Sequence, residues 1–226
     1  MRISSTFNSK NFFLPLAVCS AIIISSCGND KKTDVTNEKV TETKEEICFY
    51  SYDETAGTQV RWTAFKTSDK VAVGGQFDQV NVTAGDKSTK ITDILNTIKF
   101  NIPTSSTNTA NPDRDDKIIA SFFGAMNATD LILGQVKVAE GDNTSGTCTF
   151  YLTLNNVEKE VTLNYTVTDA TIKLTGEIDM VNFGAEAAVA SLNKVCGALH
   201  TGADGVTKTW STVELAIETT LKKACH

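Results

Sequence analysis

The sequence is poor in the residue types that most enzymes use for catalysis. It has two histidines, His200 and His226, and it shows no H-E-x-x-H, G-x-S-x-G or phosphate-loop motif. We therefore expect a protein that is not an enzyme. A hydrolase that uses His200 with a nearby acid stays open as an alternative, because such triads are recognised by geometry and not by spacing. With no C-x-x-C and so few histidines, we also expect no metal site and no cofactor.

Long apolar runs and an excess of positive charge are absent as well. The most apolar stretch, residues 11–26, is interrupted by Pro15 and is shorter than the roughly 20 residues of a spanning helix. No later segment is longer. The formal net charge is −6, whereas nucleic-acid binding needs a face rich in lysine and arginine. We therefore expect no nucleic-acid partner.

The start of the sequence has the pattern of residues that is typical of an export signal. Arg2 and Lys10 precede the apolar stretch, and small residues precede Cys27. The run Ile24-Ser25-Ser26-Cys27 is similar to the bacterial lipobox. We predict a lipoprotein signal peptide over residues 1–26 and lipidation of Cys27, which would anchor the chain to a membrane. A plain secretion signal and an uncleaved anchor are the alternatives.

Two further parts follow the predicted signal. Residues 27–46 are rich in Lys, Asp, Glu, Thr and Asn and hold almost no large apolar residue, which predicts a flexible tether. Residues 47–226 have the composition and length of one domain. Because Gly28 after Cys27 is unlike an inner-membrane retention signal, we expect a lipid-anchored location in the cell envelope, at the outer membrane on its periplasmic or surface side.

Four cysteines remain after the predicted cleavage site, namely Cys48, Cys148, Cys196 and Cys225. An even number in an oxidising compartment predicts two disulfides, and four cysteines allow three pairings. We favour Cys48–Cys148 with Cys196–Cys225, because each bond would tie a terminal segment to the body of the domain.

Most of the domain alternates between apolar and polar residues, as strands with one buried face do. The predicted strands cover residues 60–65, 75–83, 98–102, 131–140, 147–155, 161–167, 172–179 and 213–221. Short turn signals separate them, and Asn155-Asn156 predicts a tight hairpin. At least eight short strands with short connections indicate a mainly all-β sandwich or closed antiparallel barrel.

Two segments break this alternation and predict short helices. Residues 113–123 place apolar residues at helical spacing after an acidic start, which suits a helix N-terminus better than a cation site. Residues 182–196 are rich in alanine and end at Gly197, which is typical of a helix C-terminus.

Four stretches, taken in order, resemble the YceI-like family. They are residues 60–66 with 73–77, residues 101–104, residues 113–123 and residues 151–161. Together they extend the resemblance over about residues 48–222. Two histidines that the family often has, one after the first strand and one after the Arg-Asp pair, are absent here. Lys117 stands near the second of these positions.

The resemblance implies an eight-stranded antiparallel lipocalin-like barrel that holds an isoprenoid-like lipid. Alternating inward positions would contact the ligand, and the candidates are Trp62, Phe77, Ile98, Phe100, Leu163, Tyr165, Ile172, Leu174, Leu215 and Ile217. Ordinary core packing is the alternative for each of them. We therefore expect a membrane-tethered envelope protein that carries or sequesters an apolar lipid. A non-catalytic structural or interaction module with a packed barrel is the other hypothesis.

Overall fold

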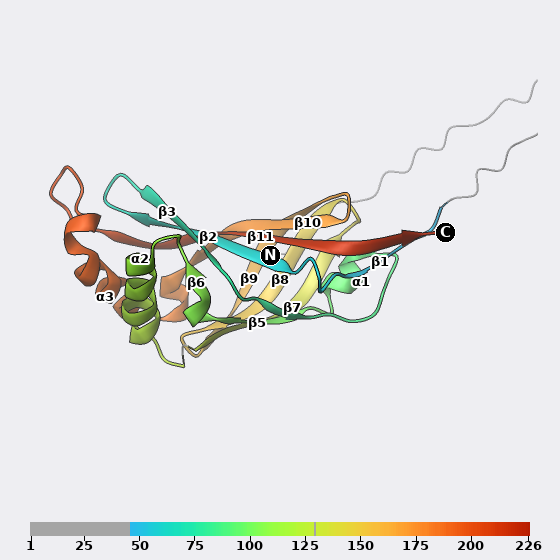
Figure 1. The fold of residues 1–226 in the computed structure, drawn as a ribbon, viewed down its shortest axis with the longest axis horizontal. Helices are drawn as coiled ribbons and strands as arrows, with labels where there is room; N and C mark the ends of the chain where they lie inside the picture. The colour runs from blue at the N-terminus through green and yellow to red at the C-terminus, as the bar shows by residue number, and fades with distance from the viewer. Residues whose placement is uncertain (1–45, 129) are drawn as a thin grey trace, which may run out of the picture. The chain divides into compact units, whose positions relative to one another are not determined.

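The computed structural model describes residues 46–128 and 130–226. The predicted signal peptide, Cys27 and nearly all of the predicted tether lie outside the described residues. These described residues belong to one compact unit. Figure 1 shows this unit as an elongated, curled antiparallel sheet with short helices at its ends. The mainly all-β, lipocalin-like fold expected from the sequence is confirmed.

The described part of the chain has eleven strand segments. They are β1 (Cys48–Tyr52), β2 (Thr58–Lys66), β3 (Val71–Phe77), β4 (Asn81–Thr83), β5 (Lys99–Pro103), β6 (Thr107–Asn108), β7 (Leu131–Gly141), β8 (Ser145–Leu154), β9 (Val157–Thr168), β10 (Thr171–Asp179) and β11 (Thr209–Cys225). Each of the predicted strands overlaps at least one of these segments. The alternation persists because one face of each strand is buried in the barrel and the other meets solvent.

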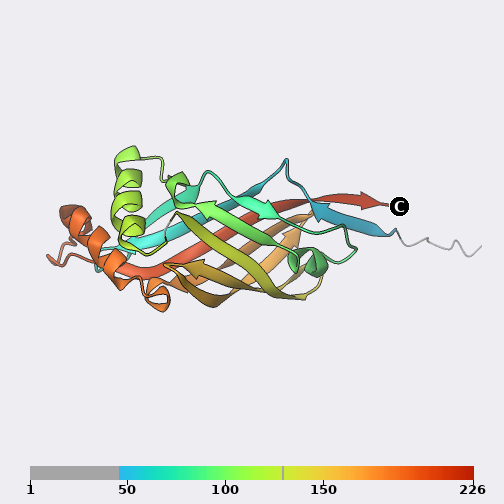
Figure 2. The ribbon, with the colours of Figure 1, turned by 90° about the horizontal axis from the view of Figure 1, so that it is seen from below.

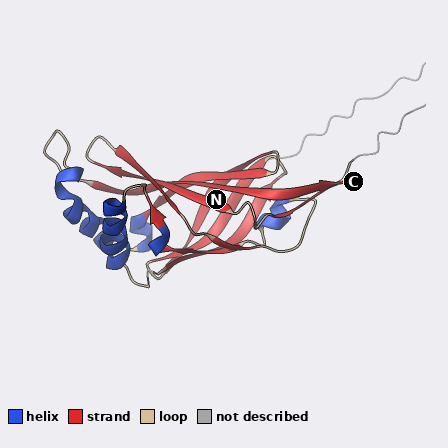
Figure 3. Ribbon diagram, in the orientation of Figure 1, coloured by secondary structure: helices blue, strands red, loops and turns tan. Residues whose placement is uncertain are grey.

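The helical segments are short, and most of them gather at one end of the sheet (Figure 3). They are α1 (Ile91–Leu95), η1 (Thr104–Ser106), α2 (Pro112–Lys117), η2 (Ile118–Phe122), η3 (Phe123–Ala125), η4 (Met180–Phe183), α3 (Glu186–Cys196) and η5 (Gly197–His200). Figure 2 places α2 and α3 at the same end, whereas α1 lies at the other end. No helix in the described ranges combines the length and hydropathy that crossing a bilayer requires.

The strands form one sheet in the order β4-β5-β7-β8-β9-β10-β11-β2-β3-β6, and β1 pairs with β11. β5 pairs with β7, whereas β6, which follows β5 after the three residues of η1, pairs with β3. The chain itself therefore joins the two sides of the curled sheet. If β5 and β6 are taken as one interrupted strand, and the short β1 and β4 as additions, the eight strands of the predicted barrel are present.

Tight turns connect the long antiparallel strands. Asn155 and Asn156 join β8 to β9 with φ values of 54° and 58°. Left-handed values at both central residues match the turn that best fits the twist of a two-residue hairpin, and asparagine tolerates them well. The hairpin predicted from Asn155-Asn156 is therefore confirmed. Asp169 and Ala170 make a second turn of this kind between β9 and β10.

Both predicted helical segments are helical in the structure. The segment predicted over residues 113–123 becomes α2 and the π-helical η2, and the side chain of Asn111 caps its start by accepting a bond from the Arg114 N–H at 3.1 Å. The segment predicted over residues 182–196 begins with part of η4 and then becomes α3, which ends at Gly197. The short helix α1 was not predicted, because it is five residues long and too brief for a periodic pattern.

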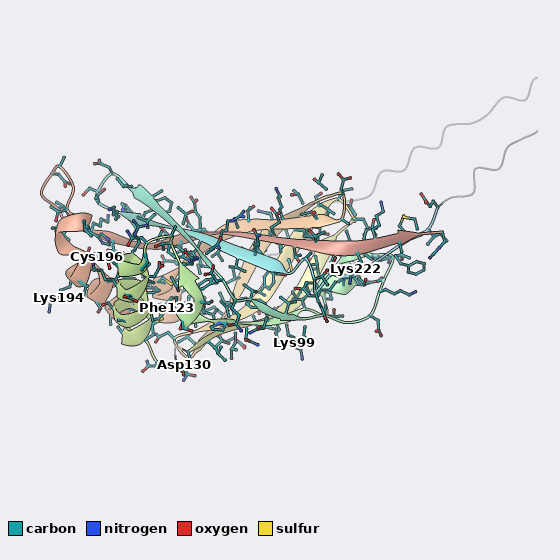
Figure 4. All side chains as sticks on the ribbon, viewed as in Figure 1. Lys99, Phe123, Asp130, Lys194, Cys196 and Lys222 are labelled. Carbon is teal, nitrogen blue, oxygen red and sulfur yellow. A yellow bond between two sulfur atoms is a disulfide. The ribbon has the colours of Figure 1, made fainter. Side chains whose placement is uncertain are left out.

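The disulfide pairing expected from the sequence is wrong. The structure joins Cys48 to Cys225, and Cys148 and Cys196 are buried and unbonded. β1 pairs antiparallel with the end of β11, and this register puts Cys48 directly opposite Cys225. Cys148 instead faces the core from the middle of β8, and Cys196 ends α3 at the opposite end of the unit from the C-terminus (Figure 4).

The interior divides into two core clusters along the barrel. The first, which we call the packed half, is built around α1 and includes Ile91, Ile94, Leu95, Cys148, Leu163, Tyr165, Ile172 and Leu174. The second, which we call the cavity half, lies below α3 and includes Ile118, Phe123, Leu152, Leu154, Met180, Phe183, Ala185 and Ala188. Phe100 and Val161 contact both clusters.

The short helix α1 fills the packed half. Ile91 and Ile94 have no exposed surface, and Leu95 has 2%. Asn143, in the β7–β8 turn, holds the helix in place because its side chain accepts a bond from the Ile91 N–H at 2.8 Å and donates to the Thr89 carbonyl at 2.9 Å. The apolar face of α1 is thus fixed inside this end of the barrel, where its side chains are close-packed with those of the strands.

Candidate ligand-binding cavity

The other end of the barrel contains a cavity of about 410 Å³. Its sheet side is formed by inward residues of β2, β3, β10 and β11, among them Ala64, Val73, Ile178 and Val213. Register explains why these four meet, since Ala64 lies opposite both Val73 and Val213, and Val213 lies opposite Ile178. The cavity is therefore a continuation of the barrel core in which side chains do not fill the space.

Helical side chains cover the cavity from the other side. Val189, Leu192 and Cys196 line it from α3 at a spacing of three and four residues, which puts them on one face of the helix. Phe122 and Phe123 line it from η2 and η3, with ring centroids 5.2 Å apart in an edge-to-face arrangement. Figure 4 shows Phe123 and Cys196 at this end of the unit. The resulting surface is predominantly apolar.

Trp62 is the largest aromatic side chain of the β2 wall. It stands opposite Gly75 of β3, and any side chain at Gly75 would overlap the Trp62 ring. The Nε1 atom of Trp62 is buried and has no hydrogen-bond partner among the residues that the structure describes. An unpaired buried N–H costs free energy, so this group is available as a donor to a polar atom in the cavity.

Charged residues gather where the cavity approaches solvent. Lys66, Arg114 and Lys117 line it together with one carboxylate, Asp113. None of the three cations forms an ion pair with another residue in the described ranges. The rim is thus more positive than the chain as a whole, whose net charge is −6. Such a rim suits a ligand whose exposed end is polar or negatively charged.

His200 lines the same cavity, in a chain of three hydrogen-bonded side chains. The Nδ2 group of Asn193 donates to the Thr207 carbonyl at 3.4 Å, which leaves Oδ1 of Asn193 to accept from the Thr209 hydroxyl at 2.9 Å. Because the Thr209 hydroxyl donates its proton to Asn193, its oxygen accepts a bond from Nδ1 of His200 at 2.6 Å. Burial, together with the nearby Lys66, lowers the pKa of His200. The neutral ring therefore keeps Nε2 free as an acceptor.

The hydrogen bond of His200 differs from that of a histidine in a hydrolase triad. The partner of His200 is a threonine, and no described carboxylate bonds to the ring. Within residues 46–128 and 130–226, the one group with metal-ligand spacing is Glu46, Cys48 and Cys225. Its two sulfur atoms form the disulfide, so they are not thiolate ligands.

The structure distributes the ten predicted ligand residues unevenly. Trp62, Phe77 and Leu215 line the cavity. Phe100 lies between the two core clusters, outside the cavity lining. The remaining six belong to the packed half or pack against it, and they are Ile98, Leu163, Tyr165, Ile172, Leu174 and Ile217. All ten alternate correctly, but these six pack in or against the core cluster that contains α1 and do not line the cavity.

The helical side of the cavity was missed. Ile118, Phe122, Val189 and Leu192 lie in the two predicted helical segments and are not among the ten residues expected to contact the ligand. The available signal was that both helical segments interrupt a run of strands, because an inserted helix in a barrel must bury its apolar face somewhere. The sequence did not tell which end of the barrel those faces would cover.

Comparisons with known proteins agree on the fold. The family model described as the YceI-like domain matches residues 50–221. A polyisoprenoid binding domain from Saccharophagus degradans, implicated in plant cell wall breakdown, is similar with a TM-score of 0.56 at 14% identity, over 79% of this chain and 99% of that one. BcnA from Burkholderia cenocepacia is similar with a TM-score of 0.52 at 14% identity, over 77% and 99%. No curated protein matches the sequence.

Proposed function

This chain belongs to the family of proteins with a YceI-like domain, and from that premise we propose that it binds an apolar, isoprenoid-like lipid in the cavity half. The observation that carries the proposal is the cavity of about 410 Å³ between the sheet and α3. Its volume lies in the range of roughly 300–1,000 Å³ that is usual for small-molecule sites, and its walls are apolar with a few polar groups, as in such sites. The polyisoprenoid binding of the Saccharophagus degradans domain supports this class of ligand.

The polar groups of the cavity suggest how the ligand is oriented. Trp62 Nε1 is an unpaired donor within the apolar wall, and His200 Nε2 is an acceptor. Lys66, Arg114 and Lys117 lie where the cavity approaches solvent. We infer that the apolar part of the ligand lies against the sheet and that a polar end group stays near the rim. The ligand stops at the packed half, because Ile91 and Ile94 occupy that interior.

We also propose that the protein is tethered to a membrane of the cell envelope through Cys27, and that it carries or sequesters the lipid. The signal-like residues 1–26 and the polar residues 27–46 support this proposal. The test is the intact mass of the protein from bacterial membranes. A lipid adduct that is lost in a Cys27→Ala variant would support the tether, whereas an unmodified Cys27 in a membrane-free fraction would contradict it.

The binding test can be made on a chain that begins at Gly28. All described strands, both core clusters and the disulfide lie between Glu46 and His226. The family match and the compact unit also lie beyond Gly28. This chain therefore contains every contact on which the described fold depends.

The experiment is native mass spectrometry of this chain, exported behind a cleavable secretion signal and purified from a bacterial envelope, with solvent extraction of whatever accompanies it. We expect a discrete apolar adduct. Ala64→Phe puts a ring into the cavity and should reduce adduct occupancy at least about tenfold, as a filled site excludes its ligand. Ala216→Phe is the matched control, because Ala216 lies on the exposed face of β11.

A different outcome would favour the alternative hypothesis. If the protein has a clean mass and takes up no polyprenyl lipid on incubation, the cavity does not bind this class of ligand. The packed interaction module would then be the better interpretation. Equal adduct occupancy in Ala64→Phe and Ala216→Phe would show that a lipid binds elsewhere on the protein.

A further inference from the structure

The end of the molecule beside the cavity carries an exposed surface formed by two loops. We call it the tip surface and define it by Lys70, Val71, Leu199, Val206 and Lys208. Backbone bonds hold its parts together, since Lys208 accepts from the Thr67 N–H at 2.9 Å and donates to the His200 carbonyl at 3.0 Å. In Figure 1 the β2–β3 hairpin, α3 and the loop before β11 lie together at this end.

The apolar members of the tip surface are unusually exposed. Leu199 has 61% of its surface accessible, Val206 has 48% and Val71 has 46%. Leu199 is also one of the residues that line the cavity. Water therefore meets a group of aliphatic side chains at the place where the cavity reaches the surface. Exposed apolar groups at such a position are typical of an interaction site.

A tryptophan lies between two lysines beneath this surface. Nζ of Lys208 is 3.3 Å from the ring centroid of Trp210, and Nζ of Lys70 is 4.5 Å from it. Trp210 Nε1 donates to the Thr67 carbonyl at 2.8 Å, which ties the ring to the hairpin. Tryptophan beside lysine and exposed aliphatic side chains is the combination found at the boundary between lipid and water.

Charge distinguishes this end from the opposite one. Residues 66–71 and 194–210 hold four lysines and two aspartates, although the whole chain is acidic. Of the two aspartates, Asp204 accepts a hydrogen bond from the backbone N–H of Val206 at 3.0 Å. The hairpin turns near α1 instead carry Asp53, Glu54, Asp142 and Asp169, of which Asp53 pairs with Lys222 of β11 at 3.4 Å. An anionic surface would therefore attract the tip and repel the turns at the other end.

We propose that the tip surface docks on an anionic lipid bilayer, with Leu199 and Val206 in the headgroup region and Lys70 and Lys208 against lipid phosphates. This goes beyond the binding of a lipid inside the barrel. The partner here is a whole bilayer, and it contacts the outer surface of the protein instead of the cavity. Docking in this orientation puts the cavity opening against the membrane. An apolar ligand can then pass between bilayer and cavity without crossing water.

The experiment is co-sedimentation of the chain from Gly28 with vesicles of phosphatidylglycerol and phosphatidylcholine, compared with phosphatidylcholine alone, at low and at physiological salt. Each lysine near an anionic surface contributes about a fivefold gain in affinity, so Lys70→Gln with Lys208→Gln should weaken binding about twenty-fivefold. Leu199→Ser should weaken it as well. Higher salt should reduce the affinity of the parent protein more than that of the double variant.

The matched control removes the same charge from the outer face of the sheet. Lys99→Gln with Lys159→Gln changes two exposed lysines of β5 and β9, and Figure 4 shows Lys99 away from the helical end. This pair should bind as the parent does. Equal losses in both double variants, or equal binding to both vesicle types, would overturn the proposal. So would the absence of binding at low salt.

A spectroscopic readout tests the orientation independently of the lysines. The sequence has two tryptophans, so Trp62→Phe leaves Trp210 as the sole reporter. Brominated phospholipid in the vesicles should quench Trp210 in this variant. Vesicle binding without quenching would contradict docking through the tip surface. Because the vesicles carry no isoprenoid, these results stand or fall separately from the ligand proposed for the cavity.

Discussion

The two halves of the barrel share their strands but differ in what covers them. β10 and β11 run through both, yet the packed half has fully buried side chains around α1, whereas the cavity half leaves about 410 Å³ open below α3. The five-residue helix α1 buries its apolar face inside one end of the barrel, whereas α3 and the neighbouring helical segments cover the other end. The difference shows that the helices between the strands, more than the strands, decide where a barrel of this kind has room for a ligand.

The comparison is sharpest on β10, where two isoleucines point to the same interior. Ile172 and Ile178 are six residues apart and therefore face the same side of the sheet. Ile172 has no exposed surface and belongs to the packed half. Ile178 is only partly buried and lines the cavity. The two side chains are identical and differ only in the packing around them. This pair therefore tests directly whether the two halves of the barrel are packed differently.

The largest expected effect is on stability. Ile172→Ala should lower the free energy of unfolding by about 2–5 kcal/mol, because it opens a void in a close-packed region. Ile178→Ala should cost about 1 kcal/mol, since its side chain already borders open space. Urea unfolding of both variants beside the parent measures the difference. Equal losses would mean that the cavity is filled in solution and that the two halves are packed alike.

The second effect concerns the two unpaired cysteines, one in each half. Burial raises the pKa of the Cys148 thiol to about 12. At pH 8 its thiolate fraction, and with it the rate of alkylation, should fall on the order of a thousandfold below that of an ordinary thiol. Cys196 lines the cavity and should react with N-ethylmaleimide in the folded protein.

Peptide mass mapping after timed alkylation distinguishes the two sites. Cys148→Ser and Cys196→Ser, each made alone, identify which thiol is consumed. An apolar ligand should slow the labelling of Cys196 and leave Cys148 unchanged. Faster labelling of Cys148 than of Cys196 in the folded state would reverse the assignment of the packed and the open half.

The smallest effect is a pH dependence that belongs to the cavity half. Burial and the neighbouring Lys66 lower the pKa of His200 below its usual value near 6.5. Between these two pKa values the unfolded chain binds more protons than the folded chain does. The free energy of unfolding should therefore be highest above pH 6.5 and should fall as the pH drops below it.

Replacement by glutamine locates this dependence. His200→Gln should flatten the change in unfolding free energy between pH 7 and pH 5, whereas His226→Gln, at the chain end, should leave it in place. Thermal or urea unfolding at several pH values measures both. In the packed half, burial raises the pKa values of Cys148 and Tyr165, so these groups do not titrate in this window. An unchanged slope in His200→Gln would place its origin elsewhere.

The sequence predicted the local backbone structure correctly where one or two residues determine it. Asn155-Asn156 predicted a two-residue hairpin because both residues tolerate a left-handed backbone, and both have positive φ in the structure. Gly197 directly follows the last residue of α3, as the sequence predicted, although its φ of −4° is not left-handed. Neither feature needed information from distant parts of the chain.

The sequence did not predict which residues far apart along the chain lie next to each other. Spacing allowed three pairings of four cysteines, and the register of β1 on β11, which joins Cys48 to Cys225 across 177 residues, was not readable from it. Likewise, Ile172 and Leu215 have the same alternation. The first is buried in the packed half, and the second lines the cavity.

The amino-acid sequence by itself determined the strands, the turns and the family, because alternation, turn residues and short motifs act over a few neighbouring positions. Only the tertiary structure decided which inward residues meet a cavity, which cysteines pair and which loops form the tip surface. These outcomes depend on how side chains from distant segments fill a common volume. Such packing is set by the whole fold, and no single segment specifies it.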